Sequence, residues 1–196
     1  LAFAGNVFVT TALLSWLPTY FNRIQGIPMG QAGVKSSIVM LMAIVGAPLG
    51  GFLADRWLRV TSNARLLFCV ISSLITAGVF FMAFSVFSGI MQYMVLIAGG
   101  ISAVAFVPAS VAVTQDVVHP GLRAISLSIC IIIQHILGSS LGPPLIGHLS
   151  DTYGIGSAML ALPLFNVIAA GLFFFASFYY NSDIAKTADV QLQAED

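Results

Sequence analysis

Charged residues are scarce in this 196-residue sequence. Lys and Arg number seven, as do Asp and Glu; together they make up 7% of the chain, whereas hydrophobic residues make up 59%. A typical soluble domain is about 25% charged, so the composition excludes a soluble globular protein. The two signs cancel, which leaves no basic field for nucleic acid. Because the sequence starts at Leu1 without a Met, we expect it to be part of a longer protein.

Cysteine and the common catalytic motifs are also nearly absent. The two cysteines, Cys69 and Cys130, lie inside apolar runs and have neither a disulfide pattern nor metal-ligand spacing. No phosphate-binding Gly-rich loop, nucleophile elbow or zinc-binding His pair occurs. The sequence therefore predicts no enzyme, no cofactor and no metal site.

Long stretches without charge indicate membrane spans. The uncharged runs cover residues 1–22, 36–54, 66–115, 124–150 and 152–182. A spanning helix needs about 20 apolar residues, so the longest run holds two helices, with a turn at Ser88 and Gly89. The predicted helices are 2–22, 32–54, 66–87, 91–115, 123–149 and 156–181. We expect a transmembrane bundle over 1–181 and a polar tail over 182–196.

The basic residues predict the orientation. Arg56, Arg59, Arg65, Arg123 and Lys186 fall on the side that holds both ends of the chain, whereas Arg23 and Lys35 fall on the other. Basic loops stay on the cytoplasmic side. Both ends of the segment and the tail are therefore predicted to be cytoplasmic, in a multi-pass protein of the cell (inner) membrane.

Small residues and an acid mark the end of the second predicted helix. Ala43, Ala47 and Gly51 recur every fourth residue and would let another helix approach closely. Asp55 lies at the C-terminal end of this helix, where the helix dipole disfavours an anion. Either Asp55 binds a group outside its own helix, or it is solvated beside Arg56.

Several motifs resemble the major facilitator superfamily of transporters. Gly51-x-x-x-Asp55-Arg56 is similar to the loop signature between its helices 8 and 9, although Leu58 replaces the second glycine. WLPTYF at 16–21 resembles the end of its helix 7. HPGLRA at 119–124, QHILG at 134–138 and GPPLIGHLSD at 142–151 are similar to helix 11 and the preceding loop of its Spinster-like branch.

The resemblance implies an all-α membrane protein, the C-terminal six-helix half (helices 7–12) of a twelve-helix transporter. Its fold would be two inverted three-helix repeats. The implied partners are an N-terminal six-helix half, membrane lipid, a small-molecule substrate and protons. The last predicted helix carries six aromatic residues that we interpret as a lipid-facing belt: Phe173, Phe174, Phe175, Phe178, Tyr179 and Tyr180.

The predicted helix 123–149 has one small and polar face. At 100° per residue this face contains Ala124, Ser128, Ile131, His135, Ser139 and Gly142, with Gly138 at its edge. An ionisable group in mid-membrane is costly and indicates function. His135 could bind an anionic substrate or relay a proton, or it could be a neutral residue that holds two helices together. Gly138 and Gly142 suggest close helix packing.

Two further sets of residues are weaker candidates. Thr11 and Ser15 share a face of the first predicted helix and could line the substrate path, although such hydroxyls often bond only to their own backbone. Pro48 and Pro108 mark points where helices could bend.

The resemblance also implies a cytoplasmic gate. It would comprise Gly51, Asp55 and Arg56 of the loop signature together with Arg123, and the partner of Asp55 would lie in the N-terminal half. Asp151 is a candidate for the outer side.

Three functions fit these observations. The first is half of a secondary transporter, which moves an organic anion or lipid-like solute by ion-coupled alternating access. The others are a six-helix protein that homodimerises and a non-transport scaffold. No ATP-binding motif is present, so an ion gradient is the expected energy source.

Overall fold

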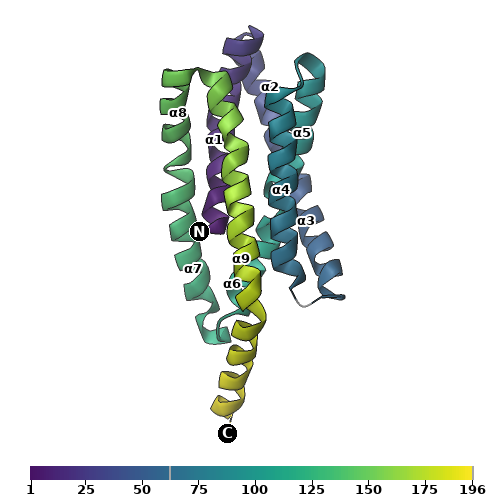
Figure 1. Cartoon of the computed structure of the whole chain (residues 1–196), viewed down its shortest axis with the longest axis vertical. Helices are drawn as coiled ribbons and strands as arrows, with labels where there is room; N and C mark the ends of the chain where they lie inside the picture. The colour runs from purple at the N-terminus through teal and green to yellow at the C-terminus, as the bar shows by residue number, and fades with distance from the viewer. Residues whose placement is uncertain (62, 196) are drawn as a thin grey trace.

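The chain folds into long helices that run up and down a bundle (Figure 1). The computed structural model describes residues 1–61 and 63–195, and the side chains of 185–195 lie outside the described part. The helices are α1 (Ala2–Gln25), α2 (Met29–Leu41), α3 (Ala43–Leu58), α4 (Ala64–Ser85), α5 (Gly89–Ala105), α6 (Val107–Asp116), α7 (Arg123–Gln134), α8 (Gly142–Tyr153) and α9 (Ile155–Glu195). Short turns η1 (Pro120–Leu122) and η2 (His135–Ser139) flank α7.

Three of the predicted spans are interrupted. The second breaks at Met42 between α2 and α3, and the fourth breaks at Phe106 between α5 and α6. Pro108 explains the second break, because it has no N–H for the carbonyl of Val104. In the fifth span, η2 is a turn of π-helix. The sixth continues as α9 to Glu195, beyond the expected end at residue 181.

Glycines bring α3 and α5 into backbone contact. A Cβ atom at Gly46 would overlap the carbonyl oxygen of Ile101, and one at Gly50 would overlap that of Ala105. Close approach of another helix was predicted for the row Ala43, Ala47 and Gly51, and at Gly51 it is confirmed. The tightest contacts, however, are made by a neighbouring row of residues. Gly46 and Gly50 make the contact with α5, whereas Gly51 lies against Pro108 of α6.

The aromatic residues of α9 divide between the core and the surface. Phe174, Phe175, Phe178 and Tyr179 are exposed, as a lipid-facing belt requires. Phe173 and Tyr180 are buried, so for these two the prediction was wrong. The ring of Phe173 packs beside Phe106, which in turn meets Phe3 edge-on at 5.2 Å between centroids.

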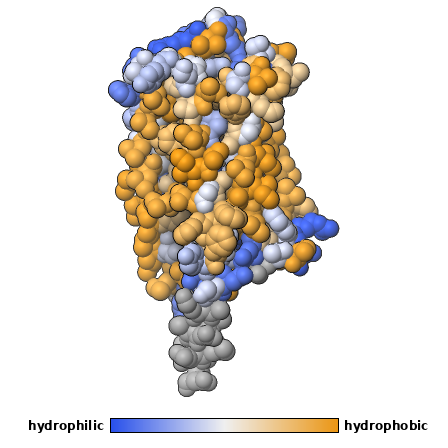
Figure 2. All heavy atoms as spheres, in the orientation of Figure 1, coloured by the Kyte–Doolittle hydropathy of each residue, from blue (hydrophilic) through white to orange (hydrophobic). Residues whose placement is uncertain are grey.

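The outside of the bundle is suited to a membrane. Figure 2 shows an apolar belt with polar residues gathered above and below it. By length and hydropathy, membrane-crossing segments in the described chain are Met29–Leu58, Ala64–Ser85, Gly89–Asp116, Pro120–Tyr153 and Ile155–Ile184. α1 has 24 residues but is not among them, since polar residues such as Asn6 and Thr10 lower its hydropathy.

Candidate functional site

His135 begins the π-turn that separates α7 from α8. Its Nδ1 atom lies 3.1 Å from the hydroxyl oxygen of Ser139, and its side chain is exposed. The amide of Ser140 donates to the carbonyl of His135 at 2.9 Å, which is the wider spacing of a π-turn. Such turns are rare and often occur at functional sites. The structure therefore brings His135 and Ser139 together at an exposed, polar break in the helix.

The glycines beside this turn form the contact with α1. A Cβ atom at Gly138 would lie 2.7 Å from the carbonyl oxygen of Ala4, and one at Gly142 would lie 2.7 Å from that of Phe8. Close packing was predicted for this pair and is confirmed. Gly142 consequently faces α1 and is not part of the polar face on which the sequence placed it.

The three other predicted path residues bond within their own helices. Ser128 donates to the carbonyl of Ala124 at 2.8 Å, Thr11 to Val7 at 2.8 Å and Ser15 to Thr11 at 2.9 Å. None makes a hydrogen bond to His135 or Ser139. Ser128 and Ser15 are exposed, whereas Thr11 is half-buried and lies against Gly142. Their role as path residues stays a prediction.

A second exposed face runs beside the polar face of α7. It consists of Ile125, Ile129, Ile132 and Ile136, which are between 53% and 58% exposed. At 100° per residue the four isoleucines fall within about 60° of arc. The helix thus presents an apolar row and, on an adjoining side, the row that contains Ser128, Ile131 and His135.

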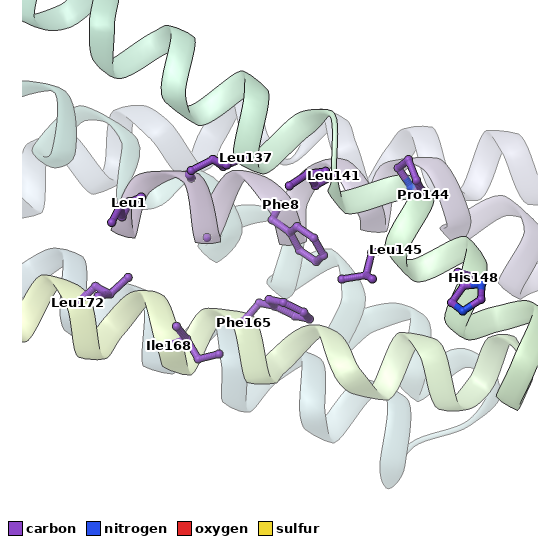
Figure 3. A pocket seen from close by; sticks show the side chains of 12 residues that line it. Leu1, Phe8, Leu137, Leu141, Pro144, Leu145, His148, Phe165, Ile168 and Leu172 are labelled. Carbon is purple, nitrogen blue, oxygen red and sulfur yellow. The ribbon is translucent and has the colours of Figure 1, made fainter.

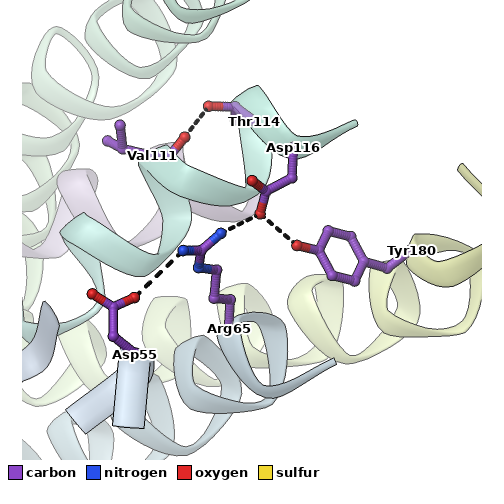
Figure 4. Close-up of polar contacts among 6 residues, drawn as sticks. All are labelled: Asp55, Arg65, Val111, Thr114, Asp116 and Tyr180. Atoms are coloured by element: carbon purple, nitrogen blue, oxygen red, sulfur yellow. Dashed lines mark hydrogen bonds and ion pairs between the residues drawn. The ribbon is translucent and has the colours of Figure 1, made fainter. Parts of the chain in front are cut away.

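At the opposite end of α3 from Met42, one arginine joins four elements (Figure 4). Arg65 of α4 donates to Asp116 at the end of α6 over 2.6 Å and lies 3.4 Å from Asp55 of α3. Tyr180 of α9 donates to the same oxygen of Asp116 at 2.7 Å. The side chains of Arg65 and Asp116 are 21% and 27% exposed, whereas that of Asp55 is 70% exposed.

This cluster was only partly visible in the sequence. For Asp55 the sequence left two interpretations open, a partner outside its own helix or solvation beside Arg56, and the resemblance implied a partner in the N-terminal half. In the structure Asp55 lies 3.4 Å from Arg65 of the same six-helix unit, and its side chain is still 70% exposed. Asp116 was not singled out, although it ends the longest uncharged run. Tyr180 was assigned to the aromatic belt, because periodicity alone does not say which aromatic ring carries a buried hydroxyl.

The remaining gate candidates lie at the surface. Arg56, Arg123 and Asp151 are exposed and form no ion pair within the described residues. Their positions leave them available to groups outside this chain. Their gate roles stay predictions.

A buried polar network at the other end of the bundle was also missed. Gln92, which is 3% exposed, donates to the hydroxyl of Tyr20 and to the carbonyl of Ala83, each at 2.7 Å. It also accepts from Gln25 at 2.7 Å. These hydrogen bonds join α1 to α4 and α5. A buried side-chain amide without partners would be costly, so the network favours this arrangement of the three helices.

Comparison with known proteins assigns the family. A profile of the Major Facilitator Superfamily matches residues 1–143, more than half of the chain. The chain belongs to the major facilitator superfamily. The six-helix unit is half of that fold, and membership in this family of transporters sets the chain apart from enzymes.

Individual relatives point to the Spinster-like branch. Protein spinster homolog 3 of Danio rerio is 26% identical over 218 residues, which cover 97% of this chain and 43% of that protein. The uncharacterized transporter YybO of Bacillus subtilis is 23% identical over 178 residues, or 89% of this chain and 41% of the relative. The chain thus spans less than half the length of these two relatives.

A solved structure has the same fold. It is a bacterial homolog of the human lysosomal transporter Spinster, in an inward-facing and occupied conformation. The TM-score is 0.82 at 22% identity, over 93% of this chain and 48% of that one. The predicted resemblance to the superfamily and to its Spinster-like branch is confirmed.

Proposed function

We propose that this chain is the C-terminal half of a secondary transporter that moves a small organic anion or lipid-like solute by ion-coupled alternating access. The observation that carries the proposal is the polar π-turn of His135 and Ser139, set in an otherwise apolar span. Breaking a membrane helix and placing an imidazole there is costly unless the site faces water or a ligand.

The uneven burial of the spans supports a missing partner half. In the most apolar window of Pro120–Tyr153 only 6% of residues are buried, and in that of Met29–Leu58 22%, whereas Ala64–Ser85 reaches 44%. The two poorly buried segments therefore have faces for which the rest of the chain offers no contact. We infer that an N-terminal six-helix half covers them and closes the path.

The charges at the Arg65 end support a gate. Asp55 has only one close contact with Arg65 and most of its side chain is exposed, so it can also bind a group from the other half. Arg56 and Arg123 are exposed and form no ion pair with the residues that the structure describes, so they can serve the same purpose. We place this end of the bundle and the C-terminal tail in the cytoplasm, in a cell membrane, on the basis of its arginines. The first residue described, Leu1, lies at mid-height of the bundle (Figure 1), so we expect the chain to reach the cytoplasmic side through the residues before it.

Protons are the coupling ion that the residues favour. His135 is the ionisable side chain at mid-span, and histidine changes charge near neutral pH when its surroundings allow. A protonated imidazole would attract an anionic solute on one side of the membrane and release it after losing the proton on the other.

The test compares the full-length protein with its His135→Ala variant. A ligand is first found by thermal stabilisation with organic acids and lysolipids, and its uptake into liposomes is then driven by a pH gradient. We expect His135→Ala to weaken binding about tenfold or more, since a hydrogen bond to a charged group is lost.

The matched control for this test is Ile136→Ala, on the adjoining apolar row, which should leave affinity and pH dependence unchanged. Equal affinity and an unaltered pH dependence in His135→Ala would reduce His135 to a packing residue. Uptake that persists after a protonophore removes the gradient would exclude proton coupling.

A further inference from the structure

A histidine ring holds the turn between α6 and α7, at the Arg65 end of the bundle. His119 immediately precedes the short turn η1. The backbone N–H of Gly121 donates to Nδ1 of this ring at 3.2 Å, and that of Leu122 donates to the backbone carbonyl of His119 at 2.8 Å. Because Pro120 has no N–H, the first two N–H groups of η1 are both bound by His119.

The ring nitrogen that accepts this bond cannot also carry a proton. A neutral imidazole with its hydrogen on Nε2 can accept at Nδ1, whereas an imidazolium has two N–H donors and no acceptor. Protonation of His119 would therefore break the bond and leave two N–H groups facing each other. Histidine ordinarily changes charge between about pH 5 and 8, so the bond can form or break within that range.

Water has access to this ring. His119 lies in the short interval between the membrane-crossing segments Gly89–Asp116 and Pro120–Tyr153, and it is partly exposed. A proton can thus reach the ring directly from the solution at this end of the bundle, without a path through the membrane.

The acidic groups nearest the turn have other partners. Asp116, which ends α6, accepts from Arg65 of α4 and from Tyr180 of α9 (Figure 4). Asp183, three residues after Tyr180 on α9, has an interaction of its own. His119 forms no ion pair with the residues that the structure describes. Protonation would therefore remove the hydrogen bond with no ion pair in place to compensate for it.

A second hydrogen bond limits how much of the chain the loss would release. Ser126 of α7 donates to the backbone carbonyl of Thr114 of α6 at 2.9 Å, so the two helices stay joined beyond the turn. The segment that would be released is 117–123. It ends at Arg123, which is exposed, carries the same sign as an imidazolium and is one of the gate candidates.

We propose that His119 is a proton-sensitive latch for the α6–α7 turn. When the ring is neutral, the turn is capped and Arg123 keeps its present position; when the ring is protonated, the cap is lost and residues 117–123 are released. The latch makes the position of a gate candidate depend on the pH at this end of the bundle. The link from Arg123 to a gate rests on the proposed function, whereas the latch itself does not.

The test is the protection of the Gly121 amide against hydrogen exchange in the full-length protein in nanodiscs, at about pH 8 and about pH 5. Protection is expressed relative to an unstructured peptide at the same pH, so that the intrinsic effect of pH on exchange cancels. The matched variant is His119→Asn, because an asparagine side chain can accept the N–H two residues further on without titrating.

The control for removing a histidine elsewhere is His148→Asn. His148 is exposed on α8, beside the apolar groove between α8 and α9 that Figure 3 shows. It lies at the other end of the bundle from the α6–α7 turn.

We expect the protection of Gly121 in the unaltered protein to fall about fivefold from the higher to the lower pH, which corresponds to the loss of one cap. His148→Asn should show the same fall, His119→Asn should keep its protection at both pH values, and His119→Leu should lack it at both. Protection that does not change with pH in the unaltered protein, or that falls equally in His119→Asn, would overturn the latch. The measurement needs no solute, so a failure of the proposed transport would leave its result intact.

Discussion

Replacing Gly50 with alanine is expected to cost the transporter about 3 kcal/mol or more of stability. The added methyl group would overlap the carbonyl oxygen of Ala105, which is backbone and cannot rotate away. α3 and α5 must therefore separate along their whole contact, which also includes Gly46 against Ile101. In thermal unfolding of the full-length protein in nanodiscs, we expect a melting temperature lower by on the order of 10 °C.

Two other glycines provide the matched control. Gly78 of α4 and Gly171 of α9 also lie within helices, but a Cβ atom there would meet nothing within 4 Å. Gly78→Ala and Gly171→Ala should be neutral or stabilise by up to about 1 kcal/mol, because alanine favours the helix. A Gly50→Ala protein as stable as these controls would show that α3 and α5 are not in backbone contact.

Removing Arg65 is the second change with a large expected effect. Arg65→Met leaves Asp116 and Asp55 without their shared cation, and Asp116 is largely buried at 27% exposure. Breaking a fully buried ion pair costs about 3–5 kcal/mol; since both partners here keep some contact with water, we expect about 2 kcal/mol. The loss is measured as a lower melting temperature.

A double variant distinguishes the stabilising effect of the Arg65–Asp116 ion pair from the effect of removing the Arg65 side chain alone. Asp116→Asn removes the stranded carboxylate, so Arg65→Met with Asp116→Asn should be more stable than the sum of the two single losses predicts. Arg59→Met, at an exposed position four residues after Asp55, should change stability by less than about 0.5 kcal/mol. Strict additivity of the two losses would contradict the pairing of Arg65 with Asp116.

The sequence predicted the spans well because a membrane excludes charge. The uncharged runs locate the helices to within a few residues at most ends, and the motifs around Gly51, Asp55 and His135 indicate the family. What it did not predict is rotation about the helix axis. The π-turn at His135–Ser139 shifts the residues that follow, so Gly142 turns toward α1 although 100° per residue places it beside His135.

The missed polar contacts have a related cause. Asp116 and Tyr180 are 51 and 115 residues away from Arg65 in the sequence. The three side chains come together only because α4, α6 and α9 pack against one another. Similarly, the break at Met42 has no proline or glycine at its own position to signal it. Such features depend on tertiary contacts, which local periodicity does not record.

The most direct test of a water-filled path on the His135 face compares two neighbouring isoleucines of α7. Ile131 lies on the row of His135 and Ile132 on the apolar row, at nearly the same depth, and both are exposed in this chain at 39% and 57%. Each is replaced by cysteine in full-length protein that lacks Cys69 and Cys130, and the reaction with a membrane-impermeant maleimide is followed.

A thiol must ionise in water to react, so we predict that Ile131→Cys is labelled on the order of tenfold faster than Ile132→Cys. In the 196-residue chain alone, where no second half encloses the path, the difference should disappear. Equal labelling of the two cysteines in the full-length protein, or faster labelling at Ile132, would contradict the account.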